Sequence, residues 1–139
     1  MRFSGFFLIA APAVPILCAC TIQTTNPPPP IVVVAQGTLE VDFSIDGIRD
    51  PNKCAQVVAS AIQVSVFSMS TGQSAGVFEG PCSAFGTSLS LSAGTYSASA
   101  VLVDAAGQPR TTAVSIDPFQ IFGNDVVIIP VDFPAVSFF

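Results

Sequence analysis

The sequence predicts an all-β protein, a single antiparallel β-sandwich of about seven strands that occupies residues 37–139. From residue 37 onward, apolar residues alternate with polar ones, a period of two that is typical of strands with one buried face. Turn-forming residues separate these short runs, and no window of twelve or more residues has a helical period. A length of 139 residues leaves room for one domain of this kind.

The first three strands are expected at residues 39–45, 62–66 and 77–79, with a Ser-Thr-Gly-Gln turn at 70–73 before the third. Four more are expected at residues 87–91, 96–102, 112–116 and 127–133. The predicted inward residues are Leu39, Val41, Phe43, Ile45, Ile62, Val64, Val66, Thr87, Leu89, Leu91, Tyr96, Ala98, Ala100, Leu102, Thr112, Val114, Ile116, Val127, Ile129, Val131 and Phe133.

Two residues mark how these strands begin and end. Gly107 closes the turn at 104–107, where a left-handed conformation suits glycine. Pro130 lies inside the last strand and indicates an edge strand, because proline cannot donate to the hydrogen-bond ladder. Residues 55–60 are the only place compatible with a short helical turn.

Residues 1–19 have the pattern of a signal peptide, with Arg2 before an apolar run from Phe6 to Ala19. Pro12 and Pro15 interrupt this run, and it is shorter than the roughly 20 apolar residues that span a bilayer. An uncleaved membrane anchor is the alternative interpretation.

The run ends in Leu17-Cys18-Ala19-Cys20, which resembles the lipobox of bacterial lipoproteins. The resemblance implies that the Cys20 thiol carries diacylglycerol and that the signal is cut just before it. Position 18 departs from the pattern, since it more often holds Ser, Ala, Thr or Val. Thr21, in place of Asp, is similar to the class directed to the outer membrane. The alternative is an ordinary secretory signal with a free thiol at Cys20.

Residues 20–36 read as a tether between that cysteine and the domain. Four consecutive prolines at 27–30 favour polyproline II and remove backbone donors. Such a segment acts as a semi-rigid spacer of about 3.1 Å per residue. A PxxP ligand for an SH3-like partner is the less favoured interpretation.

Cys54 and Cys82 remain as an even pair in an oxidising compartment, which predicts a disulfide. The alternative, a redox-active pair, usually has a Cys-x-x-Cys turn, and this spacing offers none.

The segment from Leu91 to Tyr96 reads Leu-x-x-Gly-x-Tyr, which resembles immunoglobulin-like, fibronectin-like and prealbumin-like sandwiches, especially carboxypeptidase regulatory-like domains. The resemblance implies a structural role for Tyr96, with its ring in the core and its hydroxyl bonded to backbone.

Composition and charge exclude several classes of function. The chain has no His, which removes Ser-His-Asp, Cys-His and His-bearing zinc devices. Loss of Arg2 with the leader takes the formal net charge from −5 to −6 and leaves three basic residues. Nucleic-acid binding relies on clustered Lys and Arg, so the chain has almost no cations to offer such a partner. Glu40 and Asp42 share a strand face, which is more often solvent-exposed than catalytic. We expect no enzyme, no catalytic residue and no cofactor.

Asp46, Asp50 and Asn52 are weak Ca²⁺ candidates, because oxygen ligands at such spacing can hold this ion. No Asp-x-Asp-x-Asp-Gly loop accompanies them. The favoured alternative is a solvated turn whose carboxylates are neutralised by Arg49 and Lys53.

The expected function is therefore that of a membrane-anchored envelope lipoprotein with a non-catalytic structural or binding domain. Its partners would be the lipid bilayer, through acyl chains on Cys20, and an envelope protein or glycan. The alternative is a carbohydrate-binding or enzyme-inhibiting module, which predicts exposed aromatic residues in the loops. The candidates for these aromatic residues are Phe78, Phe85, Phe119 and Phe122.

A third hypothesis, a metal-dependent hydrolase, would require carboxylates that converge in a cleft.

Overall fold

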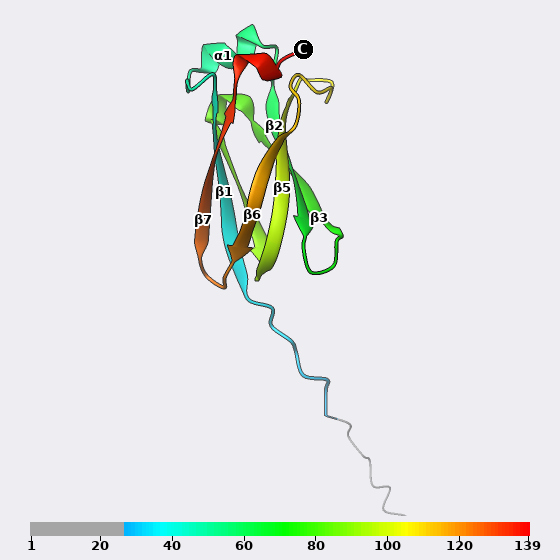
Figure 1. Ribbon diagram of the computed structural model, residues 1–139. Helices are drawn as coiled ribbons and strands as arrows, with labels where there is room; N and C mark the ends of the chain where they lie inside the picture. Colours follow the sequence, from blue (N-terminus) through cyan, green and yellow to red (C-terminus); the bar gives the residue numbers. More distant parts are fainter. Residues whose placement is uncertain (1–26) are drawn as a thin grey trace, which may run out of the picture. The chain divides into compact units, whose positions relative to one another are not determined.

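Two β-sheets face each other across a buried apolar layer in the computed structural model, which describes residues 27–139 (Figure 1). The strands are β1 (Gln36–Ile45), β2 (Ala61–Ser68), β3 (Ser74–Pro81), β4 (Gly86–Ser92), β5 (Gly94–Val103), β6 (Val114–Ile121) and β7 (Val126–Phe133). The helices are α1 (Pro51–Gln56) and two single-turn 3-10 helices, η1 (Cys82–Ala84) and η2 (Ala135–Ser137). The predicted all-β sandwich of seven strands is confirmed.

One sheet has three strands in the order β4-β1-β7, and the other has four in the order β3-β2-β5-β6. This order differs from that of the constant-type immunoglobulin sandwich, in which the first, second, fifth and fourth strands share one sheet. Here the first strand instead lies between the fourth and the last. The two sheets bury the apolar residues that face each other, as in other aligned sandwiches.

The central strand β1 follows the predicted alternation closely. Its inward residues Leu39, Val41 and Phe43 are completely buried, and Ile45 is 2% exposed. The aromatic ring of Phe43 lies 5.2 Å from that of Phe85 and 6.0 Å from that of Phe133, measured between centroids. These contacts join β1, β7 and the residue just before β4 in one apolar cluster.

One strand pair departs from the predicted antiparallel arrangement. β1 pairs with β4 antiparallel but with β7 parallel, with Val41 opposite Ile129. The first and last strands are not joined by a hairpin, so no short turn forces them to run in opposite directions. β7 pairs with β1 alone and forms an edge, as Pro130 predicted.

The sixth strand begins later than predicted. Thr112 was expected to point inward but is exposed, and β6 starts at Val114. The buried residue is its neighbour Thr111, which is 1% exposed and whose Oγ1 accepts a hydrogen bond from the Leu102 amide at 3.0 Å. A side-chain hydrogen bond thus takes the place of a backbone bond between β5 and β6 at Leu102. The alternation of buried and exposed residues is interrupted there.

The short helix also lies elsewhere than predicted. It spans Pro51–Gln56 instead of 55–60, because Asp50 caps its first turn and accepts a hydrogen bond from the Asn52 amide at 2.9 Å. Pro51 suits the first helical position, where no amide donor is needed. The residue that caps the C-terminal end of the helix is Val57.

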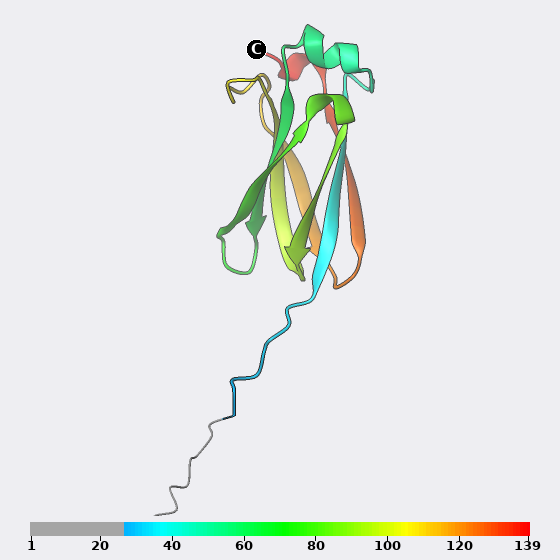
Figure 2. The same ribbon diagram turned by 180° about the vertical axis from the view of Figure 1, so that it is seen from behind.

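The sandwich has two unlike ends. α1, η1 and η2 gather at one end, and β1 begins at the opposite end, where the chain enters the domain (Figures 1 and 2). We call the end that carries α1, η1 and η2 the apical end. Every connection that contains a helix lies there.

Candidate functional site

A disulfide between Cys54 and Cys82 fixes the apical end, which confirms the predicted pairing. It joins α1 to η1, and both sulfurs lie in the core, with the two residues 6% and 1% exposed. A helix of six residues has too few hydrogen bonds to persist alone in water. The cross-link therefore holds α1 against the sandwich.

Tyr96 occupies the place that its motif implied. Its side chain is 7% exposed, and its hydroxyl donates a hydrogen bond to the Ser92 carbonyl at 2.8 Å. The ring stacks on Phe119, with centroids 6.1 Å apart. This contact ties the start of β5 to β6 and leaves Phe119 half-buried.

Four exposed apolar side chains form what we call the apical surface. Ile48, Val58, Val136 and Phe139 are 45%, 59%, 91% and 75% exposed. They come from the segment before α1, the residue pair after it, η2, and the segment that follows η2. Single exposed apolar residues are ordinary, but several at one end of a domain suggest an interaction site.

A groove of about 250 Å³ lies at the same end. We call it the apical groove; its walls are partly apolar and partly polar. The lining residues are Ile45, Asp46, Lys53, Gln56, Val57, Ala135 and Phe138. It can receive an apolar side chain of a partner while Lys53 or Asp46 meets a polar group beside it.

Val58 holds a backbone conformation that is rare for its residue type. Its φ is 58°, in the left-handed region, where a β-branched residue is strained and glycine is usual. The position closes α1, since the Val58 amide donates to Ala55 and the Ala59 amide donates to Cys54. Glycine would close the helix equally well. Valine at this position is therefore strained, and its apolar side chain is still largely exposed to solvent.

The basic residues that the structure describes all belong to the apical end: Arg49, Lys53 and Arg110. The Arg110 Nε donates to the Val57 carbonyl at 3.4 Å, beside the apical groove. Arg49 pairs with Asp42 at 3.4 Å, both half-exposed. This end thus mixes charges of both signs around its apolar residues.

The three calcium candidates have separate structural surroundings. The Asp50 carboxylate caps α1 by accepting from the amide of Asn52. Asp46 lies in a turn with a φ of 54°, and the nearby Gly47 amide donates to Asp132 instead. Among residues 27–139, no group of three or more His, Cys, Asp and Glu residues is placed to hold a metal ion.

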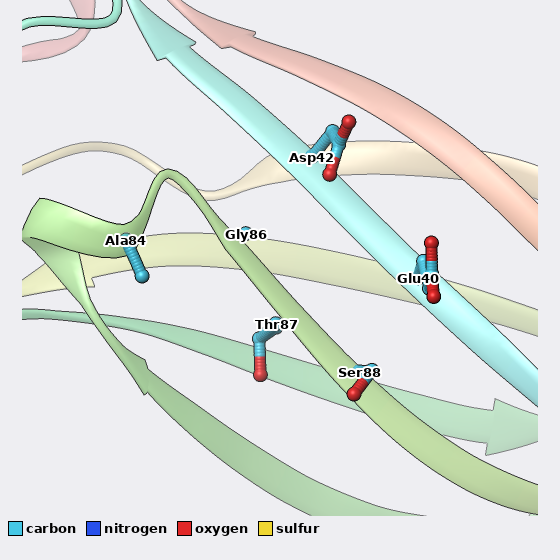
Figure 3. Close-up of a pocket in the computed structure, with 6 residues that line it drawn as sticks. All are labelled: Glu40, Asp42, Ala84, Gly86, Thr87 and Ser88. Carbon is cyan, nitrogen blue, oxygen red and sulfur yellow. The ribbon is translucent and has the colours of Figure 1, made fainter.

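The paired carboxylates Glu40 and Asp42 border an open depression of about 270 Å³ on the outer face of β1 and β4 (Figure 3). Figure 3 shows the small side chains of Ala84, Thr87 and Ser88 alongside them. Asp42 is occupied by its pair with Arg49. The depression therefore offers a shallow, mostly polar surface.

The four phenylalanines proposed as sugar-stacking candidates do not gather on one surface. Phe85 is 7% exposed and packs in the core, and Phe78 and Phe119 are half-buried against that core. Phe122 is the exposed member of the four, at 54%. Only one of the four candidates is therefore largely exposed.

The signal peptide at 1–19 and Cys20 lie outside the described residues, so the structure bears on neither prediction. Within residues 27–139, none of the helices has the length and apolar character needed to cross a membrane. Ile48, Val58 and Val136 of the apical surface were missed by sequence reasoning because they come from separate turns. Their only signal was that each is an apolar residue outside the alternating strands.

No family model matches the sequence, and no curated protein matches it either. Among solved structures, the fold is similar to part of a leucine-rich repeat protein from Bacteroides thetaiotaomicron, with a TM-score of 0.50 and 14% identity. That match covers 73% of this chain and 12% of the other. The Bacillus anthracis TIE protein matches with a TM-score of 0.46 and 13% identity, over 70% of this chain and 16% of the other. These likenesses concern the fold.

Proposed function

We propose that the protein is a lipid-anchored envelope lipoprotein whose sandwich is a non-catalytic binding module. The observation that carries the proposal is the order of features in the sequence. An apolar leader ends in Leu17-Cys18-Ala19-Cys20, and a proline-rich tether then leads into one disulfide-bonded domain. Two or three acyl chains hold a protein in a bilayer without any membrane-binding protein surface.

The position of the apical surface supports a binding role. The chain enters the sandwich at the start of β1, and the apical surface lies at the other end of the strands (Figure 2). A domain tethered through its entry point leaves its opposite end open to partners. Val58 is strained and exposed, and it follows Val57 of the apical groove in the sequence; binding explains such a feature and stability does not.

A protein partner is favoured over a glycan. Sugar rings stack on flat exposed aromatics, whereas the apical surface offers Ile48, Val58 and Val136 together with Phe139. Exposed aliphatic side chains at the same end as the apical groove suit an apolar anchor residue of another protein. A separate point concerns the order of the strands. We infer that this order is prealbumin-like and not immunoglobulin-like, because β1 pairs with β4 and β7.

The lipid anchor is tested by growing cells with labelled palmitate. We expect the parent chain to be labelled and to sediment with membranes. The variant C20S should lose the label, and the matched variant C18S should keep it, because serine is usual at that position of the lipobox. Label that persists in C20S, or an unlabelled parent chain, would refute the anchor.

The apical surface is tested by site-specific photocrosslinking in intact cells. A photoreactive residue at Val136 should give a defined crosslinked protein band. The same residue at Ser115, an exposed position on β6, serves as the matched control. The variant V58D, combined with the probe at Val136, should remove the band. Equal crosslinking from both positions would contradict an apical binding site.

A further inference from the structure

A run of four β-branched residues between the prolines and β1 is not explained by the sandwich. Ile31, Val32, Val33 and Val34 are 89%, 80%, 85% and 54% exposed. A spacer needs no such run, and the preceding residues 21–30 contain only one aliphatic residue, Ile22, among Thr, Gln, Asn and Pro. Isoleucine and valine have among the highest preferences for extended strands. We call residues 31–34 the tether strand.

The tether strand has backbone groups available for pairing. The ladder between β1 and β4 ends where the Ala93 amide donates to the Ala35 carbonyl at 2.8 Å. Within residues 27–139, no backbone hydrogen bond involves 31–34, and these residues belong to neither sheet. An extended segment with free amides and carbonyls is a template for another strand.

Both faces of the tether strand are apolar. Ile31 and Val33 would lie on one side of an extended chain, and Val32 and Val34 on the other. Strands with this composition are stable when a second strand covers their edge and neighbouring side chains cover their faces. The prolines at 27–30 cannot donate hydrogen bonds, so pairing can begin only at residue 31.

Charge favours a second copy of the same chain as the partner strand. The mature chain carries a net charge of −6, which would repel another copy over most of its surface. Residues 21–39 contain no charged side chain, and the first is Glu40. Two tether strands can therefore approach each other without facing like charges.

We propose that the tether strands of two copies pair in parallel and in register, so that this lipoprotein is a dimer joined below its sandwiches. The direction rests on the proposed lipid anchor, because two chains that start in one membrane leave it in the same direction. Two short strands pair only marginally in solution. Anchoring in one membrane raises their effective concentration and makes such weak pairing effective.

A cysteine scan of the full chain in growing cells tests the pairing. Adjacent parallel strands are about 4.8 Å apart, within the range that a disulfide spans between Cα atoms. The variants I31C, V32C, V33C and V34C should each give a reducible dimer band. The control S115C places a thiol on an exposed strand of the sandwich and should give at most a tenth of that band.

The pattern of crosslinks separates the possible outcomes. Antiparallel pairing would give a strong homodimer at one position at most, and burial in the bilayer would protect the thiols without any dimer. Either result, or bands no stronger than that of S115C, would overturn the proposal. If the chain takes up palmitate but forms no crosslinked dimer, only the dimer proposal is refuted. If it neither takes up palmitate nor forms the dimer band, the proposed lipid anchor is refuted as well.

A second pair of variants separates strand pairing from general stickiness. In the V32C background, the added change V33T keeps a β-branched residue of similar shape and should retain the dimer band. The change V33K places like charges opposite each other and should reduce the band at least fivefold. Both positions lie outside the sandwich, so neither change should alter its melting temperature. Equal bands from V33T and V33K would contradict pairing.

Discussion

Reduction of the bond between Cys54 and Cys82 should destabilise the domain strongly. The two residues are separated by 28 positions, so the disulfide closes a loop of about 29 residues in the unfolded chain. The chain-entropy relation then gives a loss of about 3.6 kcal/mol at 25 °C. With an m-value of about 1.5 kcal/mol/M, the urea midpoint should fall by about 2.4 M.

The assay compares urea unfolding of the oxidised protein with that of the same protein in reductant, followed by circular dichroism. Reduction keeps both sulfur atoms in the core, so it isolates the cross-link from any change in packing. The variant C54A/C82A should show a loss at least as large, because it also removes buried atoms. A midpoint that moves by less than about 0.5 M on reduction would refute the reasoning.

Three further changes test single contacts. V58G should stabilise the domain by about 1 kcal/mol by relieving the left-handed strain, and V58A should gain less, as thermal melting would report. Y96F should cost about 1 kcal/mol because the Ser92 carbonyl loses its hydrogen bond, and an unchanged melting temperature would contradict that role. G37A should cost about 1 to 3 kcal/mol, since an added methyl group would overlap the Phe122 carbonyl; a variant as stable as the parent would contradict this expectation.

The sequence predicted those parts of the fold that depend on local alternation. Every second residue from Leu39 to Ile45 is buried because one face of β1 packs against the opposite sheet and successive side chains point to opposite faces. Pro130 identified an edge strand for a reason that is equally local. Tyr96 was placed by a six-residue motif that covers one turn and the start of one strand.

Features that depend on contacts between distant segments were not predictable in this way. Thr111 replaces Thr112 inside the domain because its hydroxyl meets the Leu102 amide, nine residues away. The parallel direction of β7 depends on its neighbour β1, at the other end of the chain.

The apical surface shows the same limit. It combines Ile48 and Val58 from the connection between β1 and β2 with Val136 and Phe139 from the segment after β7, and no short window of sequence contains all four. The tether strand, by contrast, is visible in the sequence as four consecutive β-branched residues. Its exposure became evident only when the structure placed it outside both sheets.

The intact mass of the protein extracted from membranes tests the central claim most directly. The account predicts a chain that begins at Cys20, carries the added mass of a diacylglyceryl group with or without a third acyl chain, and lacks the hydrogens lost in the bond between Cys54 and Cys82. A full-length chain with an unmodified leader and reduced thiols would contradict it.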